Sequence, residues 1–167
     1  KEINDKPNDN VVNRLINRDF ECKKIDSFKI EQRIILGGYP EVLKLDNELK
    51  RTLWFSSYIS TYIERDAREL GEIREINNFF KFFNVIAPRT ATLLNKSKLA
   101  KESALKNSMI DNFLTILTQL HQVELVRPYF ANIGKQFVKS PKLFMIDTGI
   151  ACHMLRIKDT KTLEASL

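Results

Sequence analysis

The sequence predicts an α+β protein that is mainly α, with a helical N-terminal segment followed by a winged helix-turn-helix and a small β-hairpin wing. Three observations predict this class. Apolar residues recur at steps of three and four over most of residues 48–120, as they do on helices with one buried face. Two of these helices are joined by a short turn at 103–107. After His121 the apolar pattern becomes that of strands, which turn near Gly134.

Composition limits the class of protein further. Hydrophobic residues make up 43% of the 167-residue chain and charged residues 29%, which is typical of a globular domain. No apolar run approaches the roughly 18 residues that span a bilayer, so we expect no membrane partner. Cys22 and Cys152 form no disulfide framework, and we therefore expect a reducing, cytoplasmic setting. Because the chain begins at Lys1 without Met or a signal core, we interpret it as a fragment.

The first predicted unit, residues 1–74, is a helical connecting segment. The turn Gly37-Gly38-Tyr39-Pro40 ends one element and starts the next. From Glu48 to Ile73 the pattern is that of one helix. Its inward face is predicted to hold Leu53, Trp54, Phe55, Tyr58, Ile59, Tyr62, Ile63 and Leu70. The opposite face carries the pairs Glu64/Arg68 and Arg65/Glu69, each spaced by four residues.

The second predicted unit, residues 75–147, is the winged helix-turn-helix domain. This unit opens with a buried helix that ends at Pro88. The inward face of this helix is predicted to hold Ile76, Phe79, Phe80, Phe83, Ile86 and Ala87. Asn95-Lys96-Ser97 starts a short helix over Lys98–Glu102, and Asn107 or Ser108 caps the long second helix. The inward face of that second helix is predicted to hold Ile110, Phe113, Leu114, Leu117 and Leu120. The third unit, residues 148–167, begins with a helix capped by Asp147.

Positive charge is concentrated in the second unit. The chain has a formal net charge of +6, and residues 81–142 alone hold ten basic and three acidic residues. A basic patch confined to one module favours a polyanionic partner, and DNA is the usual partner of a winged helix. The residues expected to reach base edges from the second helix are Lys106, Ser108, Asn112 and Thr115. Those expected to contact phosphates from the wing are Arg127, Lys135, Lys139 and Lys142.

Two other functions fit the same pattern. The module can dock one protein domain on another without binding DNA, because Asp111 and the scarcity of Arg on the exposed face of the second helix weaken base readout. A free-standing transcriptional regulator is the third hypothesis.

The sequence predicts neither a catalytic nor a metal site. The phosphate loop GxxxxGK[ST] is absent from the chain, so it cannot hydrolyse a nucleotide by that route. Asp147 is followed by no E-x-K string, and His121 and His153 stand alone. We therefore predict that this chain is not an enzyme by itself and holds no cofactor or metal.

Four groups of strings carry a resemblance to a known family. They are Gly37-Gly38-Tyr39-Pro40-Glu41-Val42; Trp54, Tyr58-Ile59 and Tyr62-Ile63-Glu64-Arg65-Asp66; Leu94-Asn95, Leu99-Ala100, Pro128-Tyr129 and Asn132; and Lys139-Ser140-Pro141-Lys142-Leu143-Phe144 with Asp147-Thr148-Gly149-Ile150. Over about residues 31–157 the chain resembles prokaryotic predicted AAA-type ATPases that carry a C-terminal domain of unknown function. The last group is the most specific.

The resemblance implies a larger parent protein. An AAA module that binds ATP and Mg would precede Lys1, and a nuclease-like region would follow Leu167. Residues 1–74 would then be the end of the ATPase lid, and the winged helix would recruit substrate to the ATPase. The implied partners are the AAA module and the nuclease-like region, together with DNA, and a homo-oligomer is allowed. Arg65 could reach nucleotide phosphates as an arginine finger does; a solvated helix face is the alternative.

Overall fold

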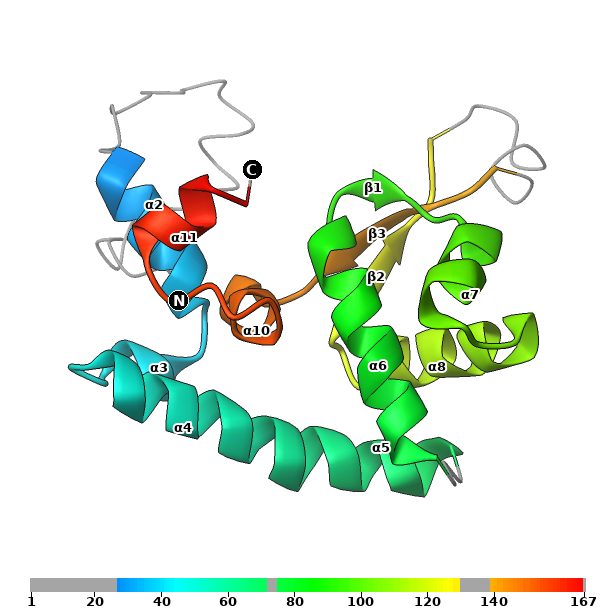
Figure 1. The fold of residues 1–167 in the computed structure, drawn as a ribbon, viewed down its shortest axis with the longest axis horizontal. Coiled ribbons are helices and arrows are strands. Elements are labelled where there is room, and N and C mark those ends of the chain that lie inside the picture. Colours follow the sequence, from blue (N-terminus) through cyan, green and yellow to red (C-terminus); the bar gives the residue numbers. More distant parts are fainter. Residues whose placement is uncertain (1–26, 72–74, 130–138, 167) are drawn as a thin grey trace, which may run out of the picture.

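The computed structural model describes residues 27–71, 75–129 and 139–166 (Figure 1). Helices dominate and a small antiparallel sheet accompanies them, which confirms the predicted class, α+β and mainly α. The helical elements are α2 (Ser27–Leu36), α3 (Pro40–Leu43), α4 (Glu48–Tyr58), the π-helical turn η1 (Ile59–Ile63), α5 (Glu64–Gly71), α6 (Ile76–Ile86), the 3₁₀ turn η2 (Ala87–Arg89), α7 (Lys96–Ser103), α8 (Asn107–Gln119), α10 (Thr148–Met154) and α11 (Thr160–Glu164). The strands are β1 (Thr92–Leu93), β2 (Val123–Val126) and β3 (Lys142–Met145).

The turn at residues 37–40 separates α2 from α3, as predicted. The left-handed backbone of Gly37, with φ of +70°, ends α2, and Pro40 starts α3 at a position where its missing N–H is not needed. Tyr39 between them lies against Trp54 and Tyr58, with ring centroids 5.0 Å from each. This aromatic contact holds α3 on α4.

The helices α4 and α5 continue each other through η1 as one long rod (Figure 1). In η1 the backbone bonds skip one more residue than in an α-helix, as in the bond from the Glu64 N–H to the Ile59 carbonyl. The buried face therefore passes from Phe55 to Ile63 and Ala67. The prediction, which assumed a regular period, was wrong for three residues that are more than half exposed: Leu53, Tyr62 and Leu70.

The main core includes the buried faces of α6, α8 and the sheet, and Phe55 and Ile150 extend it to α4 and α10. Phe79, Phe83 and Ile86 of α6 are buried as predicted, and so is Phe82, which the predicted stripe omitted. The rings of Phe79 and Phe113 meet edge to face at 5.5 Å, and Phe82 lies 5.9 Å from the same ring. These contacts join α6 to α8 and bury a wider face of α6 than its sequence period predicts.

In the sheet, β3 lies between β1 and β2 and is antiparallel to both. Leu143 of β3 is opposite Thr92 and Leu125, and it is buried on the face that covers the core. Lys142 is opposite Leu93 and Val126, and all three are exposed on the other face. The two-residue strand β1 was not predicted, because it is too short to show a period of two. The predicted strand over residues 135–138 lies outside the described residues.

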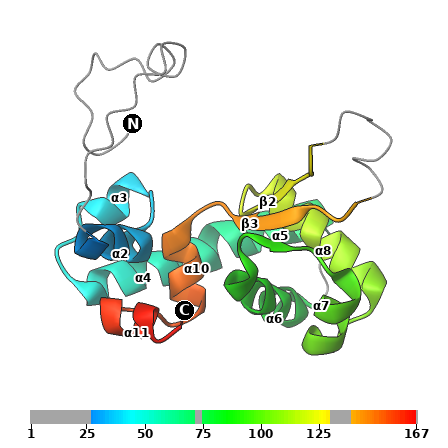
Figure 2. The ribbon, with the colours of Figure 1, turned by 90° about the horizontal axis from the view of Figure 1, so that it is seen from above.

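The C-terminal helices return to the N-terminal ones. α10 packs against α2 and α4, and α11 packs against α2. Figure 2 shows these helices and α3 at one end of the molecule, with the sheet, α6, α7 and α8 at the other. Part of the predicted unit 148–167 thus shares an interface with part of the unit 1–74, and the boundaries of the three units stay a prediction. None of the helices in residues 27–71, 75–129 and 139–166 has the length and apolarity needed to cross a bilayer.

Candidate nucleic-acid interface

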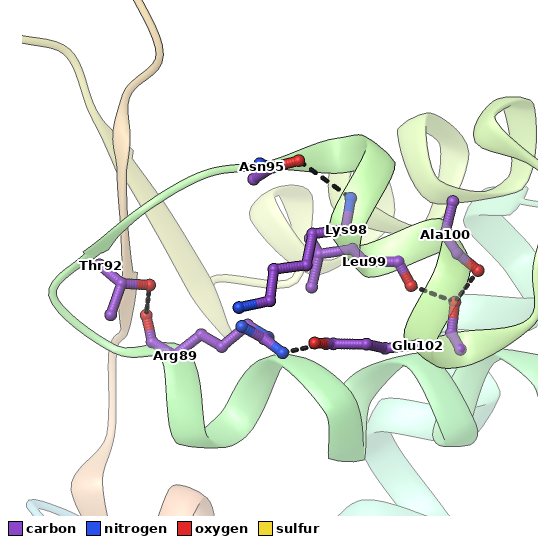
Figure 3. Close-up of polar contacts among 8 residues, drawn as sticks. Arg89, Thr92, Asn95, Lys98, Leu99, Ala100 and Glu102 are labelled. Atoms are coloured by element: carbon purple, nitrogen blue, oxygen red, sulfur yellow. Dashed lines mark hydrogen bonds and ion pairs between the residues drawn. The ribbon is translucent and has the colours of Figure 1, made fainter.

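The predicted helix-turn-helix corresponds to α7, a tight turn and α8. The side chain of Asn95 accepts the Lys98 backbone N–H at 2.9 Å, which caps α7 as an Asn does at a helix start. At the other end Ala104 is left-handed, with φ of 54°, and the Leu105 N–H reaches back to the Ala100 carbonyl at 3.1 Å. The buried Ser103 hydroxyl donates to the Leu99 carbonyl at 2.6 Å (Figure 3). The turn is therefore held by backbone hydrogen bonds and by the Ser103 hydroxyl.

The second helix begins one or two residues earlier than predicted. Lys106 is the cap residue of α8, and its carbonyl accepts the N–H groups of Met109 and Ile110 at 2.9 and 3.2 Å. The prediction that Asn107 or Ser108 caps α8 was wrong, because the turn brings Asn107 into helical conformation and no side chain caps this end. The inward stripe is confirmed for Ile110, Phe113, Leu114 and Leu117 and includes Ile116, while Leu120 is only partly buried.

The structure places the predicted base-contacting residues along α8 and at its N-terminal cap. Ser108, Asn112 and Thr115 are exposed, and their spacing of four and three residues places them on one face of the helix. Lys106, also exposed, lies at the end of the same helix. The Thr115 hydroxyl donates to the Asp111 carbonyl at 2.9 Å, so its oxygen faces outward mainly as an acceptor.

The predicted phosphate-contacting residues are less closely grouped. Arg127 follows β2 and Lys139 precedes β3, and both are exposed at the base of the predicted wing. Lys142 projects from the face of the sheet that is turned away from the core. Lys135 lies outside the described residues.

Ion pairs neutralise both carboxylates of the two-helix segment. Arg89, from η2, pairs with Glu102 of α7 (Figure 3), and Lys96 of α7 pairs with Asp111 of α8 at 2.5 Å. Each carboxylate pairs with a basic residue that lies before it in the chain, on a different element. Within the part of the chain that the structure describes, three lysines of this segment form no ion pair: Lys98, Lys101 and Lys106.

The α7 lysines and Arg89 were missed as site residues. The charge count included them, but contacts were assigned only to the second helix and the wing. Figure 3 shows the Lys98 and Arg89 side chains on the same side of α7, and both line a cavity of about 340 Å³ under the loop that leads into α7. This cavity adds a basic hollow beside the start of α7.

Arg65 lies on the exposed face of α5. Its guanidinium pairs with Asp66 at 2.8 Å and lies 5.6 Å from the centre of the Tyr62 ring. The hydrogen bond that the Arg65 guanidinium donates to Asp66 raises the pKa of Arg65. The structure thus pairs Arg65 with its neighbour instead of the predicted Glu69, whereas the predicted Glu64–Arg68 pair is confirmed at 2.9 Å. The role of Arg65 toward a nucleotide stays a prediction.

Asp147 links two of the strings that carry the family resemblance. It caps α10 as predicted, accepting the Ile150 N–H at 2.8 Å, and its second oxygen accepts the Gly38 N–H at 2.7 Å. A Cβ on Gly37 would lie 2.5 Å from the Asp147 carboxylate, and one on Gly149 would lie 2.6 Å from the Phe55 ring. The two glycines therefore allow the close approach of α2, α4 and α10. The described residues contain no group of three His, Cys, Asp or Glu that could hold a metal ion.

These features define a mainly helical α+β domain in which two helices joined by a tight turn precede strands of a small antiparallel sheet. The chain belongs to the family described as "Domain of unknown function (DUF8612)", whose model matches residues 27–161. It is similar to the uncharacterized proteins Mb2031c of Mycobacterium bovis and Rv2008c of Mycobacterium tuberculosis, with 28% identity to each over 142 residues. The match covers 85% of this chain and 32% of each relative. No solved structure matches the chain.

Proposed function

We propose that residues 76–145 form a winged helix that binds duplex DNA. The order α6, β1, α7, α8, β2, β3 supports this proposal, because a winged helix places a short strand before its two-helix motif and a hairpin after it. The observation that carries the proposal is that both carboxylates of the segment are paired, Glu102 with Arg89 and Asp111 with Lys96. With both carboxylates paired, Lys98, Lys101 and Lys106 leave net positive charge beside the polar face of α8.

In this proposal the two groups of residues have different tasks. Ser108, Asn112 and Thr115 face base edges in the major groove, where Asn can bind adenine with two hydrogen bonds. Lys98 and Lys106, with Arg127 and Lys139, contact phosphates and hold the register. Pairing of Asp111 with Lys96 reduces the repulsion that we expected from this carboxylate.

Duplex binding measured against salt tests the proposal. Each phosphate contact contributes a slope of about −0.9 to the plot of log affinity against log salt concentration. We expect Lys98→Gln and Lys106→Gln each to weaken binding to all sequences and to reduce the slope by about one. Lys161→Gln is the matched control, because Lys161 is exposed on α11 at the other end of the molecule. The proposal fails if the duplex is not bound at low salt, or if the three variants behave alike.

Reversal of two wing charges tests the wing separately. Lys135→Glu with Lys139→Glu should weaken binding to every sequence by a similar factor, because phosphate contacts carry no sequence information. Unchanged affinity would remove the wing from the interface while leaving α8 in it.

We further propose that the chain works in the cytoplasm, inside a longer protein with an AAA-type ATPase module before it and a nuclease-like region after it. The chain matches about a third of each mycobacterial relative, which leaves room for such modules. ATP and Mg would bind the ATPase module. Arg65→Gln in the longer protein would test whether Arg65 contacts the nucleotide phosphates there. A parent gene without an upstream phosphate-loop motif would refute this arrangement.

One observation favours protein docking as a second candidate function. On the outer face of the sheet, the exposed side chains of Leu93 and Val126 lie on either side of Lys142. Tyr129, after β2, is 90% exposed. Under this hypothesis, Leu93→Ser with Val126→Ser in the full-length protein should loosen the contact with a neighbouring module, which limited proteolysis between modules measures. Equal proteolysis of variant and parent would argue against docking by this face.

A further inference from the structure

A cavity of about 390 Å³ lies between α4, α10 and the turn that follows α10. Residues from α2 and α6 complete its wall, so segments more than a hundred residues apart in the sequence form it. None of the residues assigned to DNA contact lines it. Its volume is within the range of about 300–1,000 Å³ that small-molecule sites occupy.

One part of this cavity is apolar. Phe55 and Ile157 are 4% and 7% exposed, and Ile35 from α2 is half-buried beside them. Gly149 lets α10 approach Phe55, since a Cβ there would lie 2.6 Å from the ring. An apolar group of a ligand placed here would lose contact with water on several sides.

The other part of the cavity is basic. Three cations, Arg51, Arg156 and Lys158, line it together with a single carboxylate, Glu48. Glu48 pairs with Lys158 at 3.6 Å, and the Arg51 Nη1 donates to the Leu45 carbonyl at 3.2 Å. The backbone bond orients Arg51, and Asp46, the carboxylate that its charge acts on outside the cavity lining, pairs with Lys50 at 2.8 Å. The lining therefore holds three cations and one carboxylate, a net charge of +2 at one concave surface, where low-dielectric walls strengthen the field.

We propose that this cavity binds a small organic phosphate monoester, with its phosphate on the arginines and its apolar body against Phe55 and Ile157. A phosphate monoester carries a charge of about −1.5 to −2 at neutral pH, which matches the net charge of +2 of the cavity lining, whereas a monocarboxylate matches half of it. Guanidinium groups bind phosphate oxygens through paired hydrogen bonds, which favours this class of anion. The proposal is independent of DNA binding, because no residue is shared between the two surfaces.

The probe is phenyl phosphate, which joins one phosphate to one apolar ring. It is titrated into the ¹⁵N-labelled chain beside inorganic phosphate and benzyl alcohol, all at constant ionic strength. We expect saturable shifts of the amide signals of Gly149, His153 and Ile157 with phenyl phosphate. The affinity should be at least about tenfold higher than for either half of the probe alone, because both parts of the cavity are then used.

Substitutions in exposed residues then test the basic part. Arg156→Gln should weaken phenyl phosphate binding by about tenfold, the effect of losing one charge-assisted contact. Lys161→Gln, an equal loss of charge on α11 outside the cavity, should leave it unchanged. An unchanged melting temperature shows that Arg156→Gln is folded, and Arg51→Gln provides a second variant if it is not.

Each other outcome overturns a stated part of the proposal. Equal affinity for inorganic phosphate means that the apolar part is not used, and equal affinity for benzyl alcohol means that the cations are not used. Shifts that map outside the cavity, or an equal effect of the Arg156 and Lys161 variants, overturn the site itself.

Discussion

Asp147→Ala should destabilise the chain more than the loss of an ordinary helix cap. The substitution removes the acceptor of the Ile150 N–H, at the start of α10, and the acceptor of the Gly38 N–H, 109 residues away in the chain. Loss of an N-cap costs about 1 kcal/mol. A hydrogen bond to a charged acceptor contributes about 1.5–3 kcal/mol, and we take the lower value because the Gly38 bond is exposed. The expected loss is therefore about 2.5 kcal/mol.

Asn47→Ala is the matched control. Asn47 caps α4 by accepting the Lys50 N–H at 2.8 Å, the same length as the Ile150 bond of Asp147, and α4 packs against α10. Its loss should cost about 1 kcal/mol. The difference of about 1.5 kcal/mol between the two variants is then the contribution of the bond to Gly38.

Urea denaturation followed by circular dichroism measures both free energies of unfolding. The slope of the free energy against urea should stay the same in parent and variants, since no change in exposed surface is expected. If Asp147→Ala loses no more stability than Asn47→Ala, the bond to Gly38 contributes nothing and the glycines at 37 and 38 serve the turn alone.

Three further predictions concern single residues. Ala104→Gly should raise the free energy of unfolding by about 0.5–1 kcal/mol in thermal or urea melts, because Ala104 is held at φ of 54° where Gly has no steric cost; a loss of stability would contradict this. Burial raises the pKa of Cys152 to about 11. In a Cys22→Ser variant, iodoacetamide at pH 8 should therefore modify the folded chain about a hundredfold more slowly than the urea-unfolded chain. Equal rates would refute the burial of this thiol. Burial, with the nearby Lys158, lowers the pKa of His153 below its ordinary 6.5, so the unfolded chain takes up this proton first as the pH falls. The free energy of unfolding should therefore drop as the pH falls below 6.5, and His153→Gln should flatten that part of the profile.

The sequence by itself determined the parts of the protein that depend on local interactions. The apolar period identifies α6 and α8, the Asn95 and Asp147 caps mark the starts of α7 and α10, and the break at Gly37 separates α2 from α3. These features follow from the backbone and from residues three or four positions apart. Exposure of Ser108, Asn112 and Thr115 follows in the same way, since it is set by the face of α8 opposite the apolar stripe.

Only the tertiary structure decided the features that depend on distant segments. The π-turn of η1 moves the buried face of the long helix, the rings of α6 and α8 meet through Phe79 and Phe113, and Arg89 finds Glu102 on another element. The sequence predicts Asp147 as a helix cap, but its hydrogen bond with Gly38 forms only because α10 lies against α2. A periodic pattern shows which face of a helix is apolar, but the partner of that face is set by how the elements pack, and packing brings together residues whose sequence separation carries no signal.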